Sequence, residues 1–501
     1  MVSTRRVCIL VSVFGMLVSA GLARTPGFDP KDVVRRVRSR GIEGAAPDRF
    51  QPSAGSREPF ALNGEFLIDT SITPVPSPCD QREPAVAFDG VNFLVVWRDD
   101  RGGGYDYSDI YGARVTLQGT VLDPGGIAIS QAAGGQFSPA LAFDGANFLV
   151  VWHDYLHGIY SDICGARVTP QGTVLDPSGF VVSQGGAEPA VSFDGANFLV
   201  VWENGGVRGT RVTPQGTVLD SAGFVISVTE YSVSPPAIAF GGGEFLVAWD
   251  DNRGVTECDI YGARVTPQGV VLDSAGIVIS HTTSDEFYPA LSFDGANFLV
   301  AWQVSDVSAS DIYGARVTSA GEVLDPAGIA ISRAANEQYT PVVGFDGANF
   351  LVTWLDCRSG WDIYGARVTP QGTVLDPAGT AISQAANGQG SPAIGFDGAN
   401  FLVVWADCRS GSYGDIYGAR VTPEGLVLDT TGIAISIATD HQAFPVLALD
   451  GAGFLTVWED YRNGNADVYG SRVTSQGAVL DPARHRHLAG GRRPVRPCRG
   501  L

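Results

Sequence analysis

The sequence predicts an all-β protein, a closed β-propeller of eight four-stranded antiparallel blades. The first observation behind this prediction is a repeat of roughly fifty residues that runs through most of the chain. The second is that each repeat divides into short apolar segments separated by turn residues, with no helical periodicity. One tryptophan marks each repeat: Trp97, Trp152, Trp202, Trp249, Trp302, Trp354, Trp405 and Trp458. Seven blades with one surplus repeat, and an open β-solenoid, are the alternatives.

Each repeat contains four segments that we name strands A to D in chain order. In the second repeat, strand A is the apolar segment Pro139–Phe143, and Asp144-Gly145 is a strong signal for a tight hairpin turn. Strand B, Asn147–Trp152, is apolar on both faces, which predicts burial on both sides. Strand C follows the pattern Ile-Tyr-Gly-Ala-Arg-Val, and Pro-Gln-Gly turns the chain into strand D. We expect strand D to run from Gln-Gly-Thr-Val-Leu-Asp through an Asp-Pro-x-Gly kink to Ile-Ala-Ile-Ser.

The segment at residues 63–69, Asn-Gly-Glu-Phe-Leu-Ile-Asp, resembles the Gln-Gly-Thr-Val-Leu-Asp part of strand D but has no strands A to C of its own. We expect it to complete the last blade and so to close the ring with strands from both ends of the repeat region. Because neighbouring strands run antiparallel, the A–B and C–D turns share one face, which we call the turn face. The B–C and D–A connections share the opposite face, the loop face.

The connections on the loop face vary between repeats in length and in residue type, whereas the Asp-Gly and Pro-Gln-Gly turns are nearly constant. A scaffold with a binding surface would show this difference. Drift in unconstrained loops predicts the same variation. If the protein has a ligand, we expect it on the loop face.

The two ends of the chain differ from the repeats. Arg5 and Arg6, an apolar run and small residues up to Ala23 predict a signal peptide at 1–23, with an apolar run too short to span a membrane. The protein is therefore expected to be secreted, to the periplasm or the cell exterior. Residues 24–59 predict a mobile basic leader, and 60–483 the propeller domain. Residues 484–501 depart from the repeat in a way that one shifted base would explain, which predicts a disordered tail.

The B–C connections supply the candidate ligand-binding residues, which are rich in Asp, Arg and aromatic types. They are Asp99, Asp100, Arg101, Tyr105, Asp106, Tyr107, Asp250, Asp251, Arg253, Asp356, Arg358, Trp361, Asp407, Arg409, Tyr413, Asp460, Tyr461 and Arg462. The recurring W-x-D-x-R spacing also suggests an Asp–Arg pair that pins each loop. Grouped carboxylates could instead hold Ca²⁺, and no other cofactor is expected. Aromatic rings beside acids would equally suit sugar stacking and hydroxyl bonding.

Two further residues recur in strand C and favour a structural role. An arginine follows the Gly-Ala of strand C, as in Arg114 and Arg167, and an aspartate precedes the Ile-Tyr, as in Asp109. A residue that is present in almost every blade more often holds the blade together than forms a single site.

The sequence favours an extracellular binding or interaction scaffold, for a glycan or a surface protein, over an enzyme. It contains no nucleophile elbow, zinc-protease, phosphate-loop or dinucleotide motif, and strand A offers no charge toward the channel. A carbohydrate-active hydrolase that uses loop carboxylates and a purely structural surface protein are the alternatives. The net charge of −20 argues against nucleic acid as a partner. No membrane span is expected, and no oligomeric state is predicted.

The strings FDGANFLVVW and DIYGARV…G…VLD resemble those of uncharacterised secreted β-propeller repeat proteins of bacteria. The resemblance covers about residues 60–483 and implies the fold. It carries no activity that could be transferred to this chain.

Overall fold

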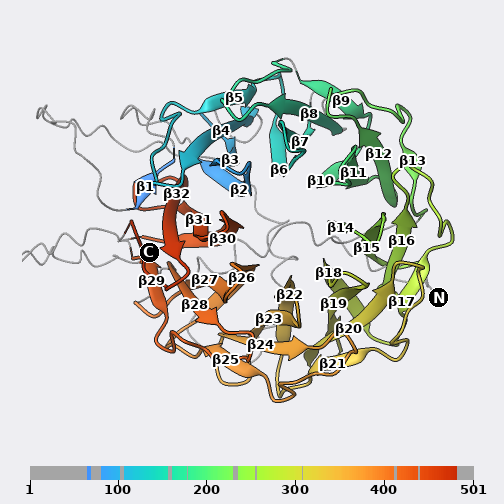
Figure 1. Cartoon of the computed structure of the whole chain (residues 1–501), viewed down its shortest axis with the longest axis vertical. Coiled ribbons are helices and arrows are strands. Elements are labelled where there is room, and N and C mark those ends of the chain that lie inside the picture. Colours follow the sequence, from blue (N-terminus) through green and yellow to red (C-terminus); the bar gives the residue numbers. More distant parts are fainter. Residues whose placement is uncertain are drawn as a thin grey trace, which may run out of the picture.

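The computed structural model describes residues 65–68, 80–101, 107–155, 161–177, 179–228, 235–253, 257–306, 309–410, 414–437 and 440–481. The predicted signal peptide, basic leader and C-terminal tail lie outside these residues. The described chain contains no α-helix and forms eight four-stranded antiparallel sheets around a central axis (Figure 1). The prediction of an eight-bladed propeller is therefore confirmed, and both alternative architectures are wrong.

The first four blades are formed by consecutive strands. Blade one contains β2 (Gln81–Phe88), β3 (Asn92–Asp99), β4 (Asp109–Thr116) and β5 (Ile127–Ser130). Blade two contains β6 (Gln136–Phe143), β7 (Phe148–Asp154), β8 (Asp162–Val168) and β9 (Phe180–Ser183). Blade three contains β10 (Ala187–Phe193), β11 (Phe198–Glu203), β12 (Val207–Val212) and β13 (Phe224–Val225). Blade four contains β14 (Ala237–Gly241), β15 (Glu244–Asp251), β16 (Asp259–Val265) and β17 (Ile277–Ser280).

The second half repeats this order until the last blade. Blade five contains β18 (Asp285–Phe293), β19 (Asn297–Ser305), β20 (Ser310–Thr318) and β21 (Ile329–Ser332). Blade six contains β22 (Gln338–Phe345), β23 (Phe350–Asp356), β24 (Asp362–Val368) and β25 (Thr380–Ser383). Blade seven contains β26 (Gln389–Phe396), β27 (Phe401–Asp407), β28 (Asp415–Val421) and β29 (Ile433–Ser436). Blade eight contains β30 (Gln442–Leu449), β31 (Gly453–Asp460), β32 (Asp467–Thr474) and β1 (Phe66–Leu67).

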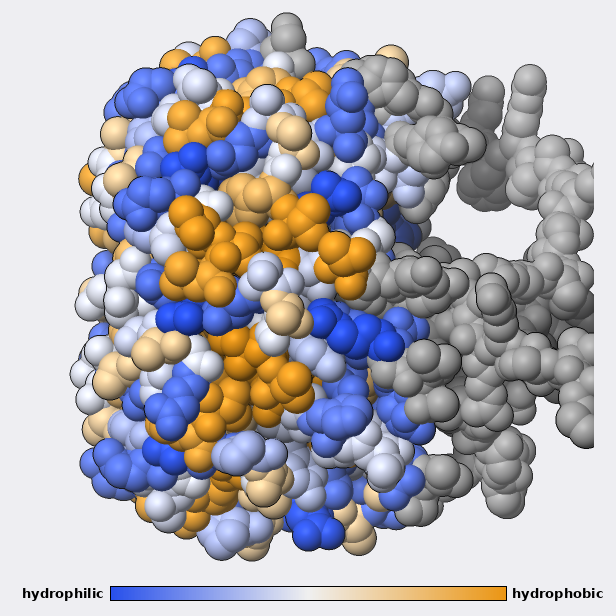
Figure 2. All heavy atoms as spheres, turned by 90° about the vertical axis from the view of Figure 1, so that its right-hand side faces the viewer, coloured by the Kyte–Doolittle hydropathy of each residue, from blue (hydrophilic) through white to orange (hydrophobic). Residues whose placement is uncertain are grey.

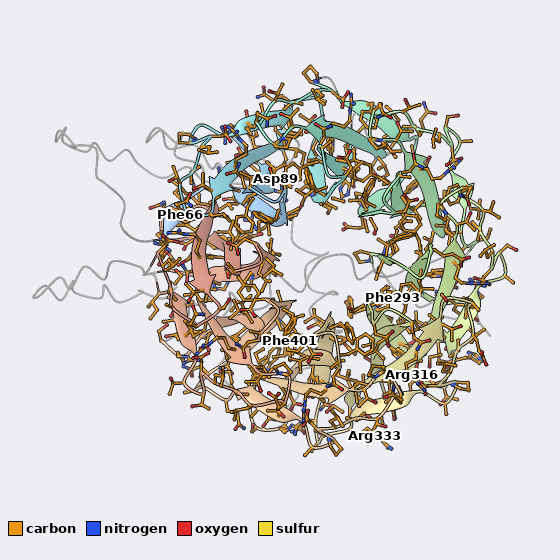
Figure 3. All side chains as sticks on the ribbon, viewed as in Figure 1. Phe66, Asp89, Phe293, Arg316, Arg333 and Phe401 are labelled. Carbon is orange, nitrogen blue, oxygen red and sulfur yellow. The ribbon has the colours of Figure 1, made fainter. Side chains whose placement is uncertain are left out.

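The core lies between neighbouring blades, as the doubly apolar strand B predicts. Trp152 of β7 is 1% exposed and packs against Leu94 and Val96 of blade one. The same arrangement recurs around the ring, where side chains such as Phe293 and Phe401 fill the space between sheets (Figure 3). The Asp-Gly turns cap the other end of strand B, because Asp144 Oδ1 accepts hydrogen bonds from two following backbone amides.

Strand D is shorter than the sequence suggests. In blade two, Val174 makes only an isolated bridge to Val168, and the chain then turns at Asp176 before it pairs with strand C as β9. The Thr-Val-Leu-Asp segment is therefore a connection that precedes the strand, and the expected strand boundary was wrong. The proline and glycine of the Asp-Pro-x-Gly sequence separate the two parts by a turn.

The ring closes as predicted, with one correction of alignment. β1 pairs with β32, and Phe66 lies opposite Gly470 just as Ile127 lies opposite Gly112 in blade one. The N-terminal segment thus corresponds to Ile-Ala-Ile-Ser and not to Gln-Gly-Thr-Val-Leu-Asp. Phe66 and Ile68 are almost fully buried in the core between blades eight and one.

The strand-C arginine links each blade to the next. In blade one, Arg114 pairs with Asp123 through two parallel hydrogen bonds of 2.8 Å, and its remaining amino group donates to Pro170 O of blade two. Equivalent bonds are made by Arg167, Arg211, Arg264, Arg316, Arg367, Arg420 and Arg472. The last of these reaches Leu117 O of blade one, so the series of bonds is circular. The structural role expected for this arginine is confirmed.

The outer rim carries the D strands and exposes apolar side chains such as Val225 and Val278. Figure 2 shows apolar patches on this rim that are interrupted by hydrophilic side chains. Within the described ranges, no helix has the length and hydropathy needed to cross a membrane.

Candidate functional site

Strand A, the innermost strand, contains a β-bulge at the residue before its proline. In blade one, Arg82 pairs with Arg98 and Ala85 with Val96, so that Glu83 and Pro84 together oppose Trp97. The residue before the proline has a φ of 48° to 57° in seven blades: Glu83, Ser138, Glu188, Tyr288, Thr340, Ser391 and Phe444. None of them is glycine, so each is held in a strained left-handed conformation.

In blades one, three and six, the backbone N–H of the strained residue donates to a side chain of the preceding blade. That side chain belongs to the residue that follows the tryptophan. The Glu83 N–H donates to Glu459 Oε1 at 2.9 Å, and the Thr340 N–H donates to Gln303 Oε1 at 3.3 Å. His153 Nδ1 accepts from the Glu188 N–H at 3.5 Å, the upper limit for such a bond. Both positions lie near the loop-face end of their strands, beside the axis. We call the two sets of residues together the inner ring.

The residue after the tryptophan differs in nearly every blade although its surroundings are nearly constant. In chain order it is Arg98, His153, Glu203, Asp250, Gln303, Leu355, Ala406 and Glu459. All but Glu203 are at most 7% exposed. Burial of a charge carries a large free-energy cost unless it is compensated, and Leu355 and Ala406 show that the fold accepts apolar residues here. The repeat architecture alone therefore does not explain the charged residues.

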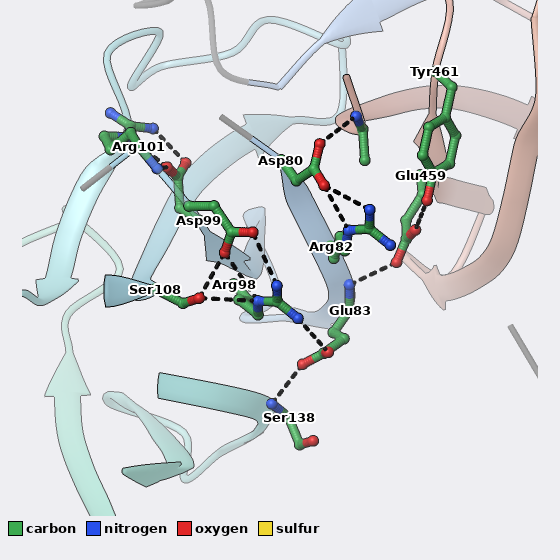
Figure 4. A network of polar contacts seen from close by, with 12 residues as sticks. Asp80, Arg82, Glu83, Arg98, Asp99, Arg101, Ser108, Ser138, Glu459 and Tyr461 are labelled. Carbon is green, nitrogen blue, oxygen red and sulfur yellow. Dashed lines mark hydrogen bonds and ion pairs between the residues drawn. The ribbon is translucent and has the colours of Figure 1, made fainter. Parts of the chain in front are cut away.

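Blades eight, one and two join their inner-ring residues in one polar network (Figure 4). Arg98 is paired with Asp100 at 2.9 Å and with Glu83 at 3.2 Å, and the second Glu83 oxygen accepts from the Ser138 N–H. On the other side, the Tyr461 hydroxyl donates to Glu459 at 3.0 Å. The network fixes the orientation of a buried cation and of two carboxylates at this side of the ring.

Two inner-ring carboxyls, those of Glu203 and Glu459, are easier to protonate than ordinary ones. Burial raises the pKa of Glu203 to about 7, with further contributions from Asp250 and Glu188. Burial likewise raises the pKa of Glu459 to about 7. The pKa of His153 is lowered to about 4 by burial and by Arg98, so this imidazole is neutral at pH 7. This part of the ring can therefore hold both protonated and ionised carboxyl groups near neutral pH.

The opposite part of the inner ring, in blades five to seven, carries no charged side chain, and the wall beside it is largely apolar. A cavity of about 380 Å³ lies there between blades four and seven, with Leu355, Val342 and several strand-A prolines in its wall. Trp361, from the B–C connection of blade six, also lines it. The inner ring thus has a charged side and an apolar side.

Most of the candidate ligand-binding residues belong to the W-x-D-x-R pattern and form ion pairs with one another within a blade. Asp99 accepts from Trp97 Nε1 and from Arg101, whose guanidinium lies 3.7 Å from the centroid of the Tyr111 ring. The same pin is formed by Asp251 with Arg253, Asp356 with Arg358, Asp407 with Arg409 and Asp460 with Arg462. The Asp–Arg pinning inferred from the spacing is confirmed, and these ten residues hold the loops in place.

The remaining candidates are divided between the inner ring and other places. Asp250 belongs to the inner ring, Asp100 and Tyr461 contact it, and Trp361 lines the cavity. Tyr107 is 62% exposed. Tyr105, Asp106 and Tyr413 lie outside the described residues.

Sequence reasoning missed the inner ring. It expected strand A to bring no charge toward the channel, whereas β2 and β10 carry Glu83 and Glu188. Its candidate residues also did not include Arg98, His153, Glu203, Gln303 and Glu459. A comparison of the position after each tryptophan across the repeats would have found them.

No group of three or more His, Cys, Asp or Glu side chains that could hold a metal ion occurs within the described ranges. The loop carboxylates that the sequence offered for Ca²⁺ are instead engaged by arginines in five blades.

The chain matches no family model and no curated protein. Comparison with solved structures finds partial matches to several enzymes. The Bacillus subtilis arabinanase Arb43A is 14% identical, with a TM-score of 0.30 over 50% of this chain and 98% of the enzyme. The α-L-arabinofuranosidase from Lactobacillus brevis is 11% identical, with a TM-score of 0.32 over 60% of this chain and 94% of that one. A GH43_1 enzyme from Xanthomonas citri is 12% identical, with a TM-score of 0.30 over 52% and 92%. Similarity at this level carries no information on activity.

Proposed function

We propose that this protein is a secreted binding propeller whose ligand docks at the inner ring, on the loop face. The observation that carries the proposal is the difference between equivalent positions of the ring. Eight equivalent positions, each directly after the tryptophan of strand B, hold Arg, His, Glu, Asp, Gln, Leu, Ala and Glu. Selection for folding alone would favour the apolar residues that blades six and seven already use.

The position of the ring supports the same function. Residues from eight blades converge there on one axis, and in seven blades the strained backbone before the strand-A proline places one further side chain beside them. Backbone strain of this kind persists where the surrounding structure enforces it, and it is common at ligand sites. The proposed ligand is a glycan or a protein of the cell exterior.

The test is binding to a glycan array and to purified cell-wall polysaccharides, with three single variants. Glu203→Leu and His153→Leu introduce the residue of blade six, and Gln171→Ala changes the turn face. We expect both leucine variants to fold and to weaken binding by about tenfold, while Gln171→Ala binds like the unchanged protein. Equal binding by all four proteins would reject the inner ring as the site.

One observation favours hydrolysis as a second function of this site. Glu203 has a pKa of about 7 and lies close enough to Glu188 and Asp250 for their charges to raise it. Glycoside hydrolysis uses one protonated and one ionised carboxyl. In this proposal Glu203 is the acid and Asp250 is the second carboxyl, because burial raises the pKa of Glu188 as well. Release of reducing sugar from a bound polysaccharide, lost in Glu203→Gln, would support an enzyme. Binding without release would leave the protein a binding module.

A further inference from the structure

We infer that the cavity beside Trp361 is the subsite for one ring of a neutral saccharide. The inference deepens the proposed function, since it assigns a ligand class to the apolar side of the inner ring. The cavity holds about 380 Å³ and is lined by residues of four successive blades, among them Tyr288, Thr340, Ser391 and Trp361.

Trp361 is the exceptional tryptophan of the chain. Trp361 is 46% exposed as a residue, whereas each of the eight repeat tryptophans is at most 1% exposed. Its ring lies 6.5 Å from that of Tyr339, centroid to centroid, at 34°. Its backbone oxygen accepts from the Gln389 N–H at 2.7 Å, so the residue is anchored to blade seven. A large ring with one side open to a cavity is a platform for a flat apolar surface.

The fold does not require a tryptophan at this position. The residues that make the same backbone bond in other blades are Ser108, Ser161, Cys258, Gly414 and Ala466, all of them small. Blade six alone among these carries a large side chain, and that side chain points to a space lined by residues of its neighbours. The tryptophan therefore serves something other than the blade itself.

A glycine in blade seven keeps the same space open. Gly390 lines the cavity, and the equivalent residues are Arg82, Phe137, Ala187, Phe287, Tyr339 and Ala443. A Cβ atom at Gly390 would meet no atom within 4 Å, and its φ is not among the positive values. Neither crowding nor backbone conformation demands glycine here. The absence of a side chain leaves room in front of Trp361.

The polar groups of the cavity fit hydroxyl groups and not charges. The Thr340 and Ser391 hydroxyls make no hydrogen bond to a described residue, although both residues are partly buried in the wall. No ionisable side chain other than the Tyr288 phenol lines the cavity within the described part of the chain. A pyranose or furanose ring has an apolar face for the indole and hydroxyls at its edge for Thr340 and Ser391. An extended apolar peptide would need a series of exposed rings, and this wall offers one exposed indole.

Two matched variants test the subsite. Trp361→Ser introduces the residue of blades one, two and five, and Gly390→Phe introduces the residue of blades two and five. Both should keep the fold, because the same side chains occupy the same backbone positions elsewhere in the ring. Thermal denaturation and circular dichroism check that they do. Binding is measured on an array of neutral and charged saccharides and by titration of tryptophan fluorescence.

We expect the unchanged protein to bind at least one neutral saccharide with a shift in fluorescence. Both variants should bind it about tenfold more weakly or not at all, and Trp361→Ser should lose the fluorescence shift. Binding that is unchanged in both folded variants, binding of charged saccharides alone, or binding of no saccharide would overturn the inference. If Glu203→Leu weakens binding and the cavity variants do not, the inner ring is still the site and only the subsite is rejected. If the cavity variants weaken binding and Glu203→Leu does not, the subsite stands without the charged side of the ring.

Discussion

At the scale of single residues, the same charged side-chain types have two different roles in this protein. Aspartates and arginines that recur with fixed spacing form pins within a blade and bonds between blades. Aspartates and glutamates that lie at equivalent positions whose residue type changes from blade to blade belong to the inner ring. Recurrence therefore separates structural from candidate functional charges better than residue type does.

The pin of blade four should be costly to break. Burial raises the pKa of Asp251, but hydrogen bonds from Arg253 and Trp249 outweigh burial and hold it below its ordinary value of 3.8. Arg253→Ala would leave a fully buried carboxylate with only part of its bonding. We expect a loss of about 3 kcal/mol in the free energy of unfolding at pH 7. Urea denaturation at several pH values measures it.

The sign of the pH effect follows from the lowered pKa of Asp251. The paired carboxylate contributes stability above pH 3.8 and loses this contribution as the pH falls through its lower folded value. The penalty of Arg253→Ala should therefore stay nearly complete above pH 3.8 and shrink only as the pH falls below that value. Arg333→Ala is the control, because Arg333 is 68% exposed and lies 3.9 Å from Asp311. Its removal should change stability by less than about 0.5 kcal/mol, and an equal loss in both variants would contradict the role of the pin.

Glu459 should make the protein less stable as the pH rises. Its pKa is raised by burial from 4.5 to about 7, so its contribution to stability is complete below pH 4.5 and lost as the pH passes through 7. Glu459→Gln removes this titration while it keeps an acceptor for the Glu83 N–H. Compared with the unchanged protein, the variant should gain stability between pH 5 and pH 8. The comparison is needed because His153, with its lowered pKa, titrates in the opposite sense. A difference that does not change with pH would contradict the raised pKa.

At the scale of the strand, the bulge of strand A joins backbone conformation to the site. Proline disfavours the helical conformation in the residue before it, and the bulge places that residue at positive φ. In seven blades the residue is Glu, Ser, Tyr, Thr or Phe, although glycine would be unstrained. A side chain is thus retained at this point of the inner ring in spite of its cost.

Ser391→Gly should release this strain. The left-handed conformation costs an L-residue about 1–2 kcal/mol, and the greater entropy of glycine in the unfolded chain offsets part of the gain. We expect the free energy of unfolding to rise by up to about 1 kcal/mol. Ser391→Ala keeps the φ of 52° and should bring no gain. If alanine and glycine stabilise the protein equally, the hydroxyl and not the backbone was the unfavourable feature.

Much of the fold could be predicted from the sequence, because it depends on local signals that recur in eight repeats. This holds for the number of blades, strands B and C, the turns and the closure of the ring. The start of strand D could not be predicted, because Thr-Val-Leu has the residue pattern of a strand. Only after the turn that follows this segment does the chain pair with strand C. The pins were predictable from the spacing of Asp251 and Arg253. The variable position after each tryptophan could have been found by aligning the repeats. Its contacts with strand A and the cavity could not, because they join positions such as Glu83 and Glu459 that lie far apart in the chain.

At the scale of the whole molecule, the ring is held by two different kinds of closure. The arginine series runs through all eight blades and returns from Arg472 to Leu117 O. β1 supplies the outer strand of blade eight, although it precedes blade one in the sequence. The first closure is a set of polar bonds between neighbouring blades, whereas the second ties the two ends of the chain together through a shared core.

Removal of β1 should open the ring. A chain that begins at Asp80 lacks Phe66 and Ile68, which are 4% and 0% exposed, and lacks the Glu65 partner of Arg462. Loss of one buried large apolar side chain typically costs about 3–5 kcal/mol, and the bared edge of β32 can pair with other chains. We expect a lower thermal midpoint and aggregation. A chain that begins at Phe60 keeps β1 and should behave like the full protein, while a peptide of residues 60–70 added in trans should restore part of the midpoint of the shorter chain. An unchanged midpoint without β1 would show that the arginine series alone is sufficient to close the propeller.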